Sequence, residues 1–241
     1  MISYFPITLS LLLILAGMLF LLLIMVLLDI LNYAHVKMGI APKYVFAVLF
    51  LSLAGSYINI PIMRFPQVRV VSEQEIIYFG IRYVLPVVRD WPGTILAVNL
   101  GGAVVPLLTS LYLLIKNRLW GRGILGTAIV AAVCHALAHE VPGMGIAIPV
   151  FIPPLAATAV ALILSRQQVA PLAYISGSLG TLIGADLLNL DRIQSLGTPI
   201  ASIGGSGTFD GIFITGLMAV LFAILATRLT EVQDDSKRSA D

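Results

Sequence analysis

Two aspartates lie within apolar stretches of the sequence, where a carboxylate is costly and therefore points to chemistry. Asp186 follows the string GTLIGA and Asp210 follows the string GGSGTF. An ionisable side chain inside a membrane span costs about 2.5–3.5 kcal/mol on insertion scales, so each one suggests a functional role. Two carboxyl groups in contact would share a proton, because both cannot ionise in a low-dielectric site. Asp186 and Asp210 would then form the catalytic pair of an aspartyl protease, which activates water against a peptide carbonyl.

Two histidines suggest a metal site near these carboxylates. His135 and His139 are four residues apart, a spacing that places both imidazoles on one face of a helix. Zinc is bound by such a pair when a third ligand and a water complete its shell, and Asp186 or Asp210 would be the third ligand. Glu140 would be the general base, although zincins usually place their Glu beside the first His. Zinc is the cofactor that this interpretation implies.

Other polar residues and glycines fall at the same predicted depth as the two aspartates. Irregular backbone at membrane depth survives only when it is buried in protein or lines a wet cavity, and glycine permits the close approach that such a cavity needs. We therefore predict a polar pocket that opens outward. Its further residues would be Asn99, Glu140, Asn189, Gly205, Gly207 and Gly211. The alternatives are polar helix ends in the headgroup zone, and glycines that serve close helix packing, as the spacing of Gly177, Gly180 and Gly184 would also suit.

The same pocket also fits a solute or ion transporter or channel. Asp186 and Asp210 would then be coupling carboxylates, and the segments broken by Gly and Pro would be half-helices. The ligand is a membrane peptide for a protease and a small solute or an ion for a transporter. The residues alone leave these functions open.

The composition places these residues in a membrane. Of 241 residues, 59% are hydrophobic and 11% are charged, and the mean hydropathy is +1.01. A soluble domain carries roughly a quarter charged residues, so most of this surface must face lipid. The net charge is only +2 and the Lys and Arg residues are scattered, which argues against nucleic acid as a partner. The single cysteine, Cys134, excludes an intramolecular disulfide.

About seven transmembrane helices are predicted, because about twenty apolar residues cross a hydrocarbon core of about 30 Å. The expected fold is a single all-α transmembrane domain over residues 1–241. We interpret the first apolar run as an uncleaved anchor, because no basic residue precedes it. The apolar runs lie at 5–28, 44–62, 94–115, 123–141, 145–165, 169–190 and 209–229.

The basic residues predict how these helices cross the membrane. Lys and Arg favour cytoplasmic loops, and the basic turn at 116–122 fixes one side. Alternation then places nine basic residues inside and five outside, with the N-terminus outside and the C-terminus in the cytoplasm. The expected location is the cytoplasmic (inner) membrane of a prokaryote. The inside set is Lys37, Lys43, Lys116, Arg118, Arg122, Arg166, Arg228, Lys237 and Arg238, and the outside set is Arg64, Arg69, Arg82, Arg89 and Arg192.

Two segments depart from the helical pattern. Residues 63–92 form a predicted surface insertion between the second and third spans. Within it, the run VRVV at 68–71 and the longer run at 76–88 are separated by polar residues 72–75, which predicts a small hairpin. Residues 231–241 form a charged tail, expected to be solvated on the cytoplasmic side.

Four strings of the sequence carry a resemblance to known families. GTLIGADLLNL, ASIGGSGTFDGIFITG, SYINIP and PGMGIAIPVFIPP resemble a prokaryotic membrane family known as domain of unknown function 1614, from about Gly55 onward. That resemblance implies a fold and does not imply a function. In that family the HALAHE position need not carry His. The glycine-rich string before Asp210 is also similar to the second motif of intramembrane aspartyl proteases of the presenilin and prepilin peptidase kinds. Those proteases set Asp directly after Gly, whereas Thr208 and Phe209 intervene here.

Overall fold

The computed structural model describes most of the chain between residues 28 and 238. The described residues are 17, 24, 26, 28–65, 75–78, 81–84, 93–141, 145–195, 200–205 and 211–238, and beyond Thr230 only the backbone is described. The helices are α2 (Pro42–Gly55), α3 (Val105–Asn117), α4 (Trp120–Leu137), α5 (Ile152–Leu164), α6 (Val169–Thr181) and α7 (Gly211–Arg238). A π-helical turn, η1 (Leu100–Val104), leads into α3, while η2 (Leu182–Asp186) and the 3₁₀ segment η3 (Leu187–Ser195) prolong α6.

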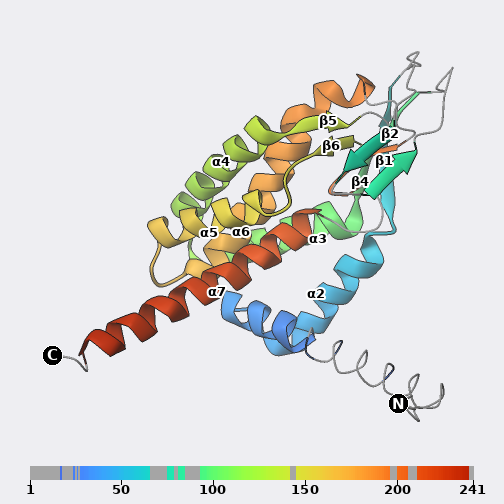
Figure 1. The fold of residues 1–241 in the computed structure, drawn as a ribbon. Helices are drawn as coiled ribbons and strands as arrows, with labels where there is room; N and C mark the ends of the chain where they lie inside the picture. The colour runs from blue at the N-terminus through green and yellow to red at the C-terminus, as the bar shows by residue number, and fades with distance from the viewer. Residues whose placement is uncertain are drawn as a thin grey trace, which may run out of the picture.

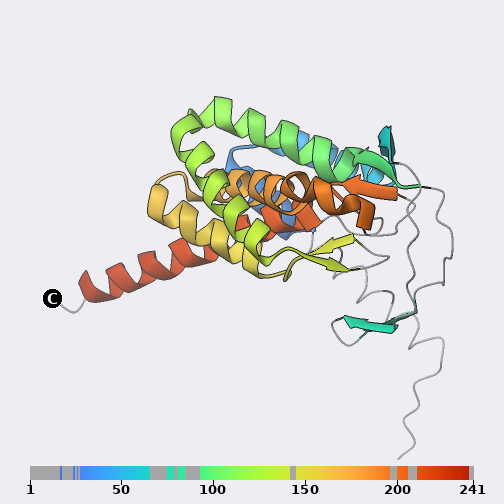
Figure 2. The same ribbon diagram turned by 90° about the horizontal axis from the view of Figure 1, so that it is seen from above.

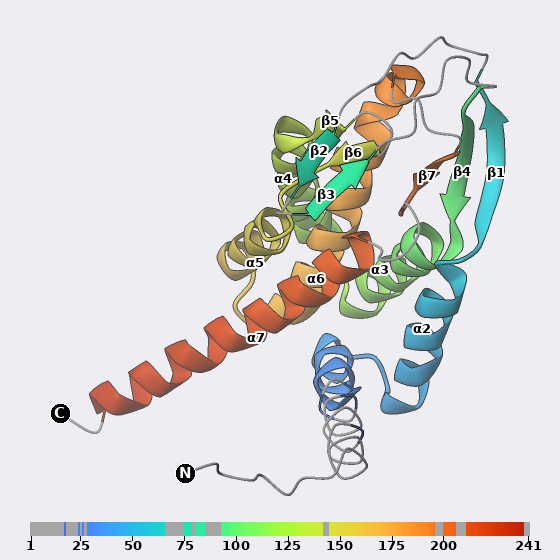
Figure 3. The ribbon, with the colours of Figure 1, turned by 45° about the vertical axis from the view of Figure 1, so that its right-hand side comes forward.

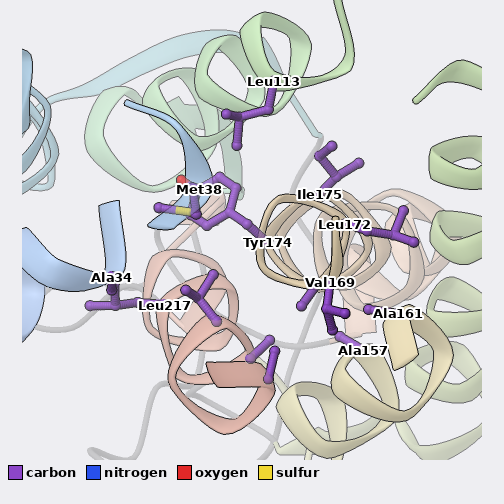
Figure 4. Packing of buried hydrophobic residues seen from close by; sticks show 14 of the residues in the cluster. Ala34, Met38, Leu113, Ala157, Ala161, Val169, Leu172, Tyr174, Ile175 and Leu217 are labelled. Atoms are coloured by element: carbon purple, nitrogen blue, oxygen red, sulfur yellow. The ribbon is translucent and has the colours of Figure 1, made fainter. Parts of the chain in front are cut away.

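The helices form a bundle with α6 at its centre. Helix α6 packs against α3, α4, α5 and α7, and Figures 1 and 2 show these helices running alongside one another. Tyr174, Leu172 and Ile175 of α6 are fully buried. In Figure 4 the Tyr174 ring points from α6 toward Met38, which belongs to the helix Leu28–Met38. The most buried helix therefore joins the N-terminal part of the described chain to the rest.

Small residues bring the helices of this bundle close together. A Cβ added at Gly184 would lie 2.3 Å from the Ala131 carbonyl oxygen of α4, and one at Gly180 would lie 2.6 Å from Val130. At Gly177 the nearest atoms, from α5 and α7, lie at 3.4–3.5 Å, which is ordinary contact. Gly180 and Gly184 thus serve close packing, as small residues do between membrane helices, whereas Gly177 leaves room for a Cβ.

Lipid is the solvent for the outer surface of this bundle. Four described helical segments are long and apolar enough to cross a membrane: Leu100–Asn117, Trp120–Leu137, Val169–Arg192 and Gly211–Thr230. Large apolar side chains such as Phe46, Ile124, Ile163 and Leu225 are exposed on the helices. An exposed apolar surface of this extent is unfavourable in water, so the chain is an all-α membrane protein.

The remaining predicted spans are shorter or bent. Helix Leu28–Met38 and helix Lys43–Gly55 meet at 113° and count as one broken span or as a re-entrant loop. Helix α5 has 13 residues, about 20 Å at 1.5 Å per residue, which is less than the hydrocarbon core. Most of the predicted first span, 5–28, lies outside the described residues. Seven spans therefore stay a prediction.

A three-stranded sheet stands where the ends of two predicted spans were expected to be helical. Strand β4 (Ile95–Asn99) pairs antiparallel with β1 (Asn59–Arg64) and parallel with β7 (Ile200–Ile203), as Figure 3 shows. The predictions of helix over 44–62 and 94–115 were therefore wrong at these ends. Helix α2 ends at Gly55, and Pro61 in β1 has no N–H for a helical bond. Short apolar runs such as ILAVN suit a strand as well as a helix.

Two hairpins complete the strands. The insertion contains a hairpin, as predicted, but its strands are β2 (Glu75–Tyr78) and β3 (Ile81–Val84), which pair antiparallel, and the predicted separator residue Glu75 belongs to β2. Both of these strands come from the 75–88 region, whereas the run at 68–71 lies outside the described residues. Strand β5 (His139–Val141) pairs with β6 (Gly145–Ala147) and was predicted as helix. Figures 1 and 2 place the sheet and β5–β6 at one end of the bundle, opposite the C-terminus.

Three basic residues with described contacts lie at the end of the bundle opposite the strands. Lys116 donates to the carbonyl of Gly39, Arg122 donates to Ser165 Oγ at 3.5 Å, and Arg228 donates to the Tyr33 hydroxyl. Arg64 of β1 and Arg192 of η3 lie at the strand end. This separation fits the predicted division of charge, while the direction in which the chain crosses the membrane stays a prediction.

Candidate functional site

Asn99 holds the strand end of the bundle together. It is 1% exposed, and its Oδ1 accepts a hydrogen bond from the Gly102 amide at 2.8 Å, which caps η1. Its Nδ2 donates to the Ser56 carbonyl at 2.7 Å and to Asn59 Oδ1 at 3.0 Å. Both amide hydrogens are used in these bonds. The sequence correctly suggested a polar residue in this layer, but here Asn99 links β4, η1 and the end of α2.

Asn59 extends this network to β7. Its Oδ1 also accepts from Ser202 Oγ at 2.5 Å, so one side-chain oxygen joins β1, β4 and β7 through Asn99 and Ser202. Neither Asn59 nor Ser202 was predicted as a site residue. Their strands are about 140 residues apart in the chain, and nothing local in either string signals the contact.

Asp186 lies beside the end of this sheet. Its Oδ2 accepts a hydrogen bond from the Gly204 amide at 2.7 Å, and the side chain is half-buried at the last residue of η2. Gly204 has φ +92°, and a Cβ there would lie 2.5 Å from the Ala103 amide nitrogen, so this position requires glycine. The turn after β7 thus holds the Asp186 carboxylate in place.

Asn189 lies one turn beyond Asp186. Its Nδ2 donates to the carbonyls of Gly184 and Ala185, both at 2.9 Å, and satisfies the carbonyls freed where the helix changes pitch. Its Oδ1 is buried and has no hydrogen-bond partner among the residues that the structure describes. The predicted pocket residue therefore presents an unpaired acceptor within three residues of the carboxylate.

The predicted pairing of two histidines on one helical face was wrong. Helix α4 ends at Leu137, and Ala138 is extended, so His139 belongs to β5. His135 is half-buried and His139 is exposed. The chain leaves the helix because residues 139–141 pair with β6, across an intervening Pro-Gly that disfavours helix. No group of three His, Cys, Asp or Glu residues in the described part of the chain is placed to hold a metal ion.

Glu140 lies on the same hairpin, toward η3. Its Oε1 lies 3.8 Å from Arg192 Nε, and both side chains are more than a third exposed. An exposed ion pair of this kind contributes little to stability, typically less than about 1 kcal/mol. It does place the β5–β6 hairpin and η3 next to each other in the polar layer.

The second predicted aspartate cannot be placed with the first. Asp210 and Gly207 lie outside the described residues, within the gap 206–210. Gly205 has φ +151° in the turn after β7, and Gly211 is the exposed first residue of α7. The pairing of Asp186 with Asp210 therefore stays a prediction.

The described geometry defines a class of protein: a multi-pass membrane bundle with a mixed sheet and a carboxylate at one end. A family model described as "Protein of unknown function (DUF1614)" matches residues 53–222. The chain belongs to this family. No curated protein and no solved structure matches the chain.

Proposed function

We propose that the layer around Asp186 binds a small cation, an inorganic ion or a protonated amine, and that the protein moves it across the membrane. The observation that carries this proposal is the Asp186 carboxylate, bound by one main-chain amide from the turn after β7. Among the described residues none forms an ion pair with it. A carboxylate in such a place is stabilised by a cation.

Two π-helical turns near the carboxylate support this proposal. Asp186 ends a π-helical turn, and a second π-helical turn, η1, begins the span that contains α3. Both turns lie within spans that are otherwise helical, and π-helical turns of this kind occur frequently at functional sites. Asn189 Oδ1 adds an acceptor without a described partner, and hard cations prefer oxygen ligands.

The position of Asp186 along its span also suits a site that opens to one side. The residue follows Val169, the first residue of the span, by 17 positions, which is about 25 Å at 1.5 Å per residue. The hydrocarbon core is about 30 Å thick, so Asp186 lies near its edge at the strand end. A cation could reach it without crossing most of the membrane.

A hydrolase with an Asp186–Asp210 pair is the second candidate. The observation that favours it is the same Gly204–Asp186 hydrogen bond, because Gly204 precedes Asp210 by only six residues in the sequence. In this case the ligand would be a membrane peptide. The two functions differ in product, since only the hydrolase releases a cleaved peptide.

Asp186→Asn is expected to reduce cation flux at least ten-fold in liposomes that contain the purified protein. Asparagine keeps an oxygen for the Gly204 amide but removes the charge, so the fold should persist while cation binding is lost. The measurement is ion flux under imposed gradients of H⁺, Na⁺ and K⁺ in turn and of methylammonium. Asp191→Asn is the matched control, because Asp191 is an exposed carboxylate five residues later in η3.

Two results would contradict transport. One is equal flux in wild type, Asp186→Asn and empty liposomes for all four cations. The other is cleavage of a reconstituted transmembrane peptide that stops in both Asp186→Asn and Asp210→Asn, which would establish the hydrolase.

A further inference from the structure

A cavity of about 490 Å³ lies at the end of the bundle opposite the strands. Helix Leu28–Met38, the turn between α5 and α6, and helices α6 and α7 form its walls. Its volume is within the range of about 300–1,000 Å³ that is usual for small-molecule sites. The polar lining residues are Tyr33, Lys37, Arg166, Gln167, Thr227 and Arg228, and the others are apolar residues of α6 and α7.

The charge of this cavity is entirely positive in the part of the chain that the structure describes. Lys37, Arg166 and Arg228 line it, and no Asp or Glu is among its described lining residues. Three cations around one cavity repel each other, and the apolar wall weakens the screening between them. An anion bound among them would remove this repulsion.

Tyr33 contacts two of these cations. The Arg228 guanidinium lies 5.4 Å from the centre of the Tyr33 ring and donates to its hydroxyl, and the Lys37 ammonium lies 5.5 Å from the same centre. Cation–π contacts of this length are attractive. Arg166, in the exposed turn before α6, is the third cation that lines the cavity. Three cations around one cavity suit a compact anion with several oxygen atoms, such as phosphate.

The depth of the cavity points to a lipid as the source of that phosphate. The span Val169–Arg192 begins at this end, and the span Gly211–Thr230 ends here, so the cavity lies at the level of the headgroups. Its apolar wall, which includes Val169 and Ile224, would contact the glycerol and the first methylene groups of a lipid. Inorganic phosphate has no apolar part and would make no contact with that apolar wall.

We propose that this cavity binds the phosphate of an anionic phospholipid. Basic pockets between membrane helices bind such headgroups by the same charge complementarity. The site is separate from Asp186, which lies in η2, toward the other end of the span Val169–Arg192.

Retention of lipid by the purified full-length protein tests this proposal. The protein is equilibrated in detergent with phosphatidylglycerol or phosphatidylcholine, and bound lipid is counted by native mass spectrometry. Each of Lys37→Gln and Arg166→Gln is expected to reduce phosphatidylglycerol retention about five-fold, and phosphatidylcholine retention should not change. Arg166→Lys should keep retention because it keeps the charge. Lys43→Gln is the matched control, since Lys43 is an exposed cation over the Tyr44 ring and does not line the cavity.

The unfolding temperature separates the sources of phosphate. Phosphatidylglycerol should raise it in wild type and in Lys43→Gln but not in the Lys37→Gln, Arg166→Gln double variant. The unfolding temperature without added lipid confirms that the double variant is folded. Stabilisation by inorganic phosphate as large as that by phosphatidylglycerol would overturn the lipid assignment. Equal phosphatidylglycerol retention in the double variant and in Lys43→Gln would overturn the site itself.

Discussion

Gly101→Ala is expected to destabilise the protein by about 3 kcal/mol or more. A Cβ at this position would lie 2.0 Å from the Ser52 carbonyl oxygen, 2.4 Å from the Ser56 amide nitrogen and 2.8 Å from the Gly55 carbonyl carbon. All three are backbone atoms, which cannot rotate away as a flexible side chain does. The whole end of α2 would have to move.

That movement would also break the contact between α2 and η1. Ser52 Oγ donates to the Gly101 carbonyl at 2.9 Å, and Ser52 is buried. The measurement is the thermal unfolding midpoint, with the folded fraction read by size-exclusion chromatography. Gly121→Ala is the matched control, because Gly121 is exposed in α4 and has nothing within 4 Å of an added Cβ. An unfolding midpoint for Gly101→Ala equal to that of Gly121→Ala would contradict this packing.

Asn99→Ala is expected to cost about 3 kcal/mol, because it leaves the buried polar groups around it unpaired. The Gly102 amide loses its acceptor, and the Ser56 carbonyl loses its donor. Asn59 Oδ1 loses the hydrogen bond from Asn99 but keeps the one from Ser202 Oγ, so it contributes less to the loss of stability. Unfolding in detergent, followed by intrinsic tryptophan fluorescence, measures the effect.

Two further variants define the role of this amide. Asn99→Asp keeps an oxygen for the Gly102 amide but turns a carboxylate oxygen toward two acceptors, so it is also expected to be destabilising. Asn117→Ala is the matched control, since Asn117 makes one bond at 3.1 Å to Leu113 of its own helix, near the other end of the bundle. If Asn99→Asp were as stable as wild type, the donor bonds of Asn99 would contribute nothing.

The long apolar helices could be predicted from the sequence because their ends are chemically distinct. Helix α4 was expected over 123–141 and spans Trp120–Leu137, and the sixth span was expected over 169–190, within the observed Val169–Arg192. Basic residues or turns flank both runs, and about twenty apolar residues leave few alternatives to a membrane helix. Membership of the family was also predicted and is confirmed.

The strand end could not be predicted in the same way. ILAVN and IASI are apolar and short, so their local composition suits a strand or a helix end equally. Their pairing depends on a partner about 100 residues away, and no residue in either string carries that information. The prediction that the HALAHE string is helical was wrong for a related reason. His135 and His139 have the spacing of one helical face, but the helix ends after Leu137 because β5 pairs with β6.

Four polar residues were predicted at one level of the bundle, but none of the contacts that they make was predicted. Asp186, Asn99, Asn189 and Glu140 were expected in one polar layer, because ionisable and amide groups collect where spans end. The structure places all four at the strand end of the bundle. Their partners are the main-chain groups of Gly204, Gly102 and Gly184, and a sequence gives the identity of such residues without their proximity.

The parallel pairing of β4 with β7 determines how late in synthesis the three-stranded sheet can form. Ile95 pairs with Ile200, so the 105th residue after β4 begins must leave the ribosome before the sheet can close. At about 5–20 residues per second this takes roughly 5–20 s, during which β4 lacks its β7 partner. Helices α3 to α6 are synthesised in that interval and can enter the membrane first. Closure of the sheet is therefore a late step of biogenesis, and a chain truncated before β7 would leave Asp186 without the amide that holds it.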